Sequence, residues 1–129
     1  MSLARYLDVE GSCWEETLSN CRRVFSSGGT VLFFPEGHRS RDGQLQRFYS
    51  GGFKAAINSG VPLIPLCVNG TDRLLPPGRK LLRPCQVSLR ALESIDTSEF
   101  TEANGHIRLR KLVKGRMAKA LEEMRTVGA

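Results

Sequence analysis

Two apolar runs separated by a helix-forming segment constrain the fold most strongly. The first, "TVLFF" at residues 30–34, is short and rich in β-forming residues, as strands buried on both faces are. The segment "GGFKAAINS" follows Ser50, a potential helix cap, and Gly60 ends it before the second run, "VPLIPLCV" at 61–68. Strands that alternate with helices are typical of α/β proteins, so we predict a mixed, mostly parallel sheet flanked by helices.

Further elements follow from capping and periodicity. Ser12 and Glu15 are spaced for a capping box, which predicts a helix over 13–27. A third strand is expected at 85–92, after a long turn-rich loop, and a last helix at 105–126, after a polar linker. Pro62 and Pro65 lack amide donors, so the strand at 61–68 should lie at an edge or carry an irregularity.

Length and composition narrow the possible functions. The 129 residues fit a single domain, 1–129, and the net charge of +6 favours an anionic partner. No apolar stretch approaches the about 20 residues of a membrane-spanning helix. Asp8 and Glu10 lie where a secretion signal would need an apolar centre, so we expect the chain on the cytoplasmic side. The four cysteines lack metal-site spacing and indicate reduced core thiols: Cys13, Cys21, Cys67 and Cys85.

The stretch "FFPEGHRS" places polar residues where the first predicted strand ends. In a tight turn, Glu36 and Arg39 can point the same way, with Gly37 allowing the bend. A guanidinium matches phosphate oxygens and a carboxylate accepts hydrogen bonds from hydroxyls, so the pair suits a phosphorylated alcohol. The alternative is a solvated basic loop with an internal Glu36–Arg39 ion pair.

Other charged residues near this stretch extend the candidate site. Arg41, Arg47 and Lys54 add positive charge, and the helix start at "SGGF" adds free amides. His38 and Asp42 are four residues apart, but an exposed polar pair is a better interpretation than a catalytic dyad, because no nucleophile accompanies them. With only two histidines in the chain, no metal site is expected.

The last predicted helix is amphipathic and basic. Its polar positions carry many cations, and we expect either a helix packed on the sheet with a solvated charged face or a helix that contacts an anionic membrane. Among these cations are Arg108, Arg110, Lys111, Lys114, Arg116 and Lys119. Its apolar face is predicted to contain Leu109, Leu112, Val113, Met117, Ala120, Leu121 and Met124.

The block "FFPEGHRS", followed by "FYSGGFKAAINSGVPLIPLCVNGT", resembles the third and fourth sequence blocks of the lysophospholipid or glycerol-phosphate acyltransferase family. The resemblance covers Thr30 to Thr71 at the family's spacing. It implies a three-layer α/β domain, here the C-terminal portion and incomplete at the N-terminus. It also implies transfer of a fatty acyl group from acyl-ACP or acyl-CoA to a lysophospholipid or glycerol phosphate, at a membrane surface and without a metal or bound cofactor.

The resemblance also assigns roles to individual residues. Arg39 is expected on the acceptor's phosphate and Glu36 on its glycerol part or on the local loop. Val61 to Leu66 correspond to an apolar wall near the acyl site. The substrate-binding residues implied are Glu36, Gly37, Arg39 and Ser40, with Arg41, Lys54, Val61 and Pro62 as neighbours of the phosphate or acyl site.

The sequence departs from the family pattern in its first two blocks. The catalytic His-x-x-x-x-Asp is absent from the 129 residues, and His38 occupies a variable position of the third block. The arginine of the second block would fall at Val9 or Glu10. Either a catalytic segment lies upstream of Met1, or the chain is a non-catalytic module that binds anionic lipid or phosphate.

The first explanation is favoured, because loss of a whole layer would leave an apolar face of the sheet uncovered. Nucleic-acid binding would rest on net charge alone and is not expected, because no recognition motif accompanies the charge.

Overall fold

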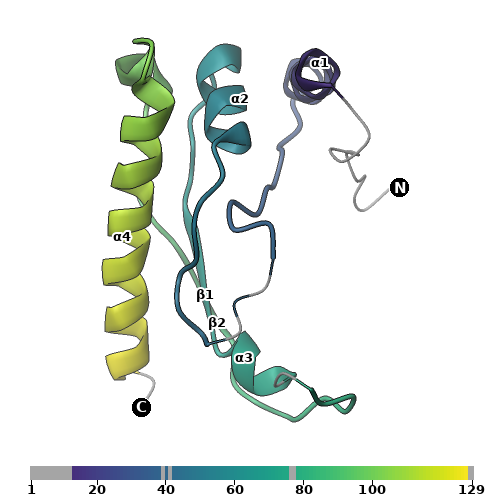
Figure 1. Ribbon diagram of the computed structural model, residues 1–129, viewed down its shortest axis with the longest axis vertical. Helices are drawn as coiled ribbons and strands as arrows, with labels where there is room; N and C mark the ends of the chain where they lie inside the picture. Colours follow the sequence, from purple (N-terminus) through teal and green to yellow (C-terminus); the bar gives the residue numbers. More distant parts are fainter. Residues whose placement is uncertain (1–12, 39, 41, 76–77, 128–129) are drawn as a thin grey trace. The chain divides into compact units, whose positions relative to one another are not determined.

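The computed structural model describes residues 13–38, 40, 42–75 and 78–127 (Figure 1). The chain divides into two compact units, residues 1–33 and 34–129, and each is described by itself. Within the described ranges, no helix is both long and apolar enough to cross a bilayer.

The described residues of the first unit, 13–33, contain one helix, α1, at Trp14–Ser26. This confirms the helix predicted at 13–27. Its N-cap is Cys13, which makes no side-chain capping bond and is exposed rather than in a core, whereas Ser12 of the expected capping box lies outside the described residues. The amide of Gly29 donates to the carbonyl of Val24 at 2.9 Å and closes the helix end.

The second unit follows the order α2, β1, α3, β2, η1, α4 (Figure 1). Helix α2, at Gly51–Ser59, has the predicted bounds, and it ends because Gly60 takes a left-handed conformation with φ of 65°. Helix α4, at Gly105–Val127, confirms the predicted helix at 105–126. The remaining elements are β1 at Leu66–Asn69, α3 at Thr71–Leu74, β2 at Ser88–Ala91 and η1, a 3-10 helix, at Thr97–Phe100.

The sheet is antiparallel, which corrects the prediction of a mostly parallel sheet. Strands β1 and β2 pair with Cys67 opposite Arg90, and an isolated antiparallel bridge joins Leu63 to Ile95. The short α3 and the loops beside it reverse the chain between the strands, and no long crossover helix returns it to the same direction. The structure describes residues 30–34, the expected first strand, without strand pairing.

The pairing contains the irregularity that the two prolines predict. Two residues separate Leu63 from Leu66 on one strand, but three separate Ala91 from Ile95 on the other, which is a β-bulge. Pro65 lies beside this bulge and takes part only as an acceptor, from the amide of Leu92 at 2.9 Å. An acceptor-only residue is tolerated there because the bulge leaves the ladder incomplete.

One face of the sheet packs against α4 (Figure 1). Cys67 of β1 forms a buried cluster with Ala120, Leu121 and Met124, and burial raises the pKa of the Cys67 thiol, although Arg90 opposes the shift. Arg90 of β2 also pairs with Glu123 of α4 at 3.1 Å. The predicted apolar face of α4 is confirmed, with these residues buried: Leu109, Val113, Ala120, Leu121 and Met124.

The segment before α4 is ordered rather than a featureless polar linker. Asp96 caps η1 by accepting the amide of Ser98 at 2.9 Å, and this hydrogen bond lowers the pKa of the Asp96 carboxyl. Gly105 then begins α4 so close to η1 that a Cβ there would lie 1.7 Å from the carbonyl oxygen of Phe100. Only glycine fits this junction, which fixes the path of the chain into α4.

Candidate substrate-binding site

The predicted turn is present at Phe34–Gly37. The amide of Gly37 donates to the carbonyl of Phe34 at 3.1 Å, with Pro35 and Glu36 as the central residues. Gly37 has φ of 69°, and a Cβ at this position would lie 3.3 Å from the ring of Tyr49. The positive φ therefore favours glycine here, and a larger residue would also crowd the Tyr49 ring.

The segment that precedes α2, residues 44–50, supports this turn. The amide of Tyr49 donates to the carbonyl of Pro35 at 2.7 Å, and the amide of Gln46 donates to Oε2 of Glu36 at 2.8 Å. One Glu36 oxygen therefore holds the local loop, as the resemblance allowed. The other oxygen, Oε1, makes no hydrogen bond to a described residue and can accept one from a hydroxyl.

His38 and Asp42 do not form a pair. Oδ1 of Asp42 accepts the Gln44 amide and Nε2 of Gln46, each at 3.0 Å, so this carboxylate orders the loop that leads to the supporting segment. His38 is exposed. Both residues are exposed, as expected, but they do not form the polar pair that the sequence suggested.

The other predicted site residues lie at different places. Arg39 and Arg41 are outside the described residues, and Ser40 is half-buried between them. Lys54 is exposed on α2 and does not pair with Glu36. It lines a cavity of about 300 Å³, whose walls also include Phe100, Glu102 and His106.

The predicted apolar wall begins directly after α2. Val61 accepts a hydrogen bond through its carbonyl from Oγ1 of Thr97 at 2.8 Å, and Pro62 is exposed. This backbone contact fixes the start of the Val61–Leu66 segment against η1. The role of Val61 and Pro62 near an acyl chain stays a prediction.

One arrangement was missed by sequence reasoning. Ser50 is the N-cap residue of α2, but its hydroxyl makes no capping bond and instead accepts from the Arg110 guanidinium of α4 at 3.0 Å. The two residues are 60 positions apart, so no local pattern could connect them. Among the described residues, no group of three or more potential metal ligands occurs.

Comparison with known proteins agrees with the motifs of the turn and of the segments that follow it. The family model described as Acyltransferase matches residues 3–69. A chloroplastic 1-acyl-sn-glycerol-3-phosphate acyltransferase of Brassica napus is 41% identical over 63 residues, which are 49% of this chain and 18% of that protein. The Escherichia coli enzyme of the same name is 41% identical over 71 residues, which are 55% of this chain and 28% of that protein.

A solved structure shows that the similarity includes the fold. The 1-acyl-sn-glycerophosphate acyltransferase PlsC of Thermotoga maritima is 32% identical and superposes with a TM-score of 0.74, over 84% of this chain and 44% of that protein. The chain thus spans under a third of the length of those curated relatives and under half of the solved one. Since the family model matches more than half of its residues, the chain belongs to the acyltransferase family.

Proposed function

We propose that this chain supplies the acceptor-binding part of an O-acyltransferase in phospholipid biosynthesis. The enzyme moves a fatty acyl group from acyl-ACP or acyl-CoA to the free hydroxyl of a lysophospholipid or glycerol phosphate, on the cytoplasmic side of a membrane with which it associates peripherally. The supporting observation is the Phe34–Gly37 turn, which lies within the matched family segment and carries Glu36 in a defined position.

In the proposed mechanism, one part of the domain binds the acceptor and another part supplies the general base. Arg39 binds the acceptor's phosphate, and the Glu36 carboxylate orients its glycerol hydroxyls, since each offers the matching hydrogen-bonding groups. A general base must then remove the proton of the attacking hydroxyl as it bonds to the acyl carbon and the donor thiolate leaves. The His-x-x-x-x-Asp pattern that would supply this base in relatives does not occur in the 129 residues.

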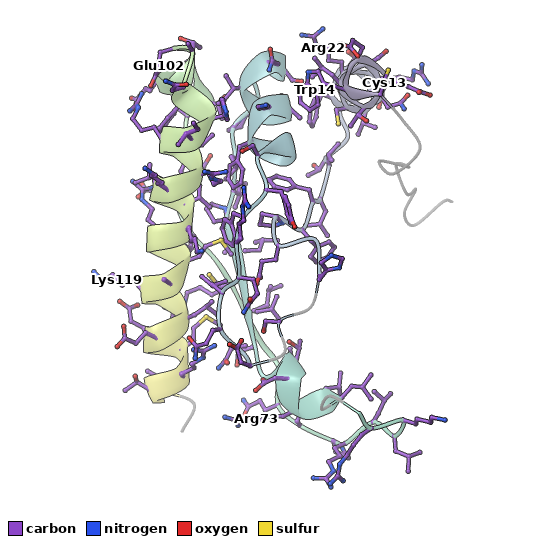
Figure 2. The ribbon with its side chains drawn as sticks, viewed as in Figure 1. Cys13, Trp14, Arg22, Arg73, Glu102 and Lys119 are labelled. Atoms are coloured by element: carbon purple, nitrogen blue, oxygen red, sulfur yellow. The ribbon has the colours of Figure 1, made fainter. Side chains whose placement is uncertain are left out.

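The decisive experiment measures acyl transfer to 1-acyl-glycerol 3-phosphate by the protein that contains this chain. Arg39→Ala should raise the acceptor KM at least tenfold, because it removes a charge-assisted contact to the phosphate. Lys119→Ala is the matched control, since Lys119 points away from the rest of the unit (Figure 2). Unchanged acceptor kinetics in Arg39→Ala would contradict the assignment.

A second candidate is a non-catalytic module that binds anionic lipid or phosphate. The net charge of +6 and the basic helix α4 favour it. Flotation with vesicles rich in phosphatidate separates the two functions. Vesicle binding that Arg39→Ala abolishes, without any acyl transfer, would support the module, whereas measurable acyl transfer would exclude it.

A further inference from the structure

A basic cavity lies between the segment 44–50 and α4. Its volume is about 210 Å³. Sites for drug-sized ligands are about 300–1,000 Å³, so this cavity suits a small group rather than a whole nucleotide. Its walls carry four cations around one aromatic ring: Arg47, Phe48, Arg110, Lys111 and Lys114.

The positive charge of these walls is not neutralised within the described part of the chain. The ion pairs found there use other residues, Arg90 with Glu123 and Arg108 with Glu102. Helix α4 contains no Asp or Glu before Glu122, and Arg110 and Lys114 are four residues apart on one helical face. Like charges at this spacing repel each other, so an anion between them would be favourable.

The cavity is held in shape by contacts that do not need a ligand. Arg110 donates to the hydroxyl of Ser50 at 3.0 Å and to the carbonyl of Phe48 at 3.4 Å. Phe48 is 2% exposed and stacks on Phe53 with the ring centroids 6.2 Å apart, and the Lys114 amine lies 5.6 Å from the centroid of the Phe48 ring. Two of the four cations are therefore positioned in advance, which lowers the entropic cost of binding.

This cavity is separate from the Phe34–Gly37 turn. The carbonyl of Phe48, which accepts from Arg110, and the amide of Tyr49, which donates to Pro35, belong to one peptide group. A trans peptide directs its carbonyl and its amide to opposite sides. The cavity and the turn thus lie on opposite sides of the segment 44–50, and one ligand phosphate cannot occupy both.

We propose that this cavity is a second anion site, which binds a single phosphate group. Arg47, Arg110, Lys111 and Lys114 hold the phosphate oxygens, and the buried Phe48 ring forms the apolar floor. The phosphate comes either from a phospholipid headgroup or from a soluble phosphate ester. Binding here requires no acyl transfer, so the proposal stands or falls independently of the proposed function.

The first test is titration of ¹⁵N-labelled protein with inorganic phosphate and with glycerol 3-phosphate at constant ionic strength. If the phosphate comes from a soluble ester, we expect saturable chemical-shift changes at the amides of Phe48, Tyr49 and residues 110–114. In a parallel arm, vesicles of phosphatidylcholine with and without phosphatidate are floated with the protein. Flotation only with phosphatidate, without saturable shifts from either soluble probe, supports the headgroup as the source.

Two double variants with the same loss of charge give the test its specificity. Lys111→Gln with Lys114→Gln should weaken the observed binding at least tenfold, and it leaves the Arg110 hydrogen bonds in place. Arg116→Gln with Lys119→Gln, on the same helix but outside the cavity walls, should change binding less than twofold. Equal losses in both variants would show diffuse attraction to a basic helix and would overturn the proposal, as would the absence of binding in both arms.

Discussion

Single side chains in this protein fix segments that are distant in sequence. Glu36 joins the turn to Gln46, ten residues away, and Thr97 joins η1 to Val61, 36 residues away. Each of these contacts involves a backbone group, so each replaces a bond that the sheet ladder or a helix would otherwise supply. The geometry of the candidate site therefore depends on a few side chains that hold distant backbone groups in place.

Replacing Glu36 should release the segment 44–50 from the turn. In Glu36→Ala the Gln46 amide loses its acceptor, and a hydrogen bond to a charged group contributes about 1–2 kcal/mol at a partly exposed site. Hydrogen exchange of the Gln46 amide should become about tenfold faster. Glu36→Gln keeps a side-chain acceptor and should show a smaller change, whereas equal exchange rates in the wild type and both variants would contradict the contact.

Replacing Thr97 should destabilise the start of the Val61–Leu66 segment. Thr97 is 2% exposed, and in Thr97→Val the Val61 carbonyl is left without its donor in a buried place. The expected loss in the free energy of unfolding is about 1–3 kcal/mol, measured by urea denaturation. Thr97→Ser keeps the donor and loses one methyl group, at a cost of about 1 kcal/mol; a larger loss for Ser than for Val would show that packing, not the hydrogen bond, dominates.

At the scale of elements, glycines and periodicity made the helices predictable. Gly60 ends α2 at the expected residue, and the charge and periodicity of α4 gave its bounds to within a residue. The four-residue elements α3 and η1 were missed, because about one helical turn is too short to show a repeating pattern of apolar residues. The direction of the strands was also missed, since an apolar run shows that a strand needs cover but not which way its neighbour runs.

The local part of the candidate site was predictable, as the helices were, but its long-range contacts were not. The sequence "FPEG" predicts a turn with an exposed carboxylate, and the turn is present. Its supports come from residues 46 and 49, and the basic cavity combines residues about 60 positions apart. Such pairings depend on how α4 docks on the segment 44–50, which no local pattern specifies.

The start of α4 should depend on pH through Glu102, which Figure 2 labels at that end of the helix. Its carboxylate accepts from Arg108 at 2.7 Å, and this hydrogen bond lowers the pKa of the Glu102 carboxyl. A folded pKa below the unfolded one, about 4.3, means that the stabilisation is present above that value and is lost as the pH falls through the folded pKa.

Thermal unfolding of the wild type and of Glu102→Gln checks this dependence. The wild type should have the higher Tm at pH 6, and the difference in Tm should shrink as the pH falls through the folded pKa of Glu102, because the carboxylate that accepts from Arg108 becomes protonated there. High salt should reduce the difference at pH 6, because the pair is exposed. A difference that is independent of pH would show that the charge of Glu102 is not involved.

For the second unit as a whole, burial alternates strictly along residues 63–68. Leu63, Pro65 and Cys67 are buried on the face that packs on α4, whereas Ile64, Leu66 and Val68 are exposed on the other face. Leu89 lies opposite Val68 and is 67% exposed, so the apolar patch extends onto β2. These exposed side chains form one apolar patch across both strands, and an exposed patch of this kind promotes association.

The same substitution at adjacent residues of this strand should therefore change the free energy of unfolding by different amounts. Leu63→Thr removes a buried side chain, 7% exposed, and should lower the free energy of unfolding by about 2–4 kcal/mol. Ile64→Thr, at 57% exposed, should change it by less than about 1 kcal/mol and should reduce self-association of the isolated chain, measured by sedimentation velocity. If Ile64→Thr destabilised the monomer as much as Leu63→Thr, the second face of this strand would be buried in solution rather than exposed.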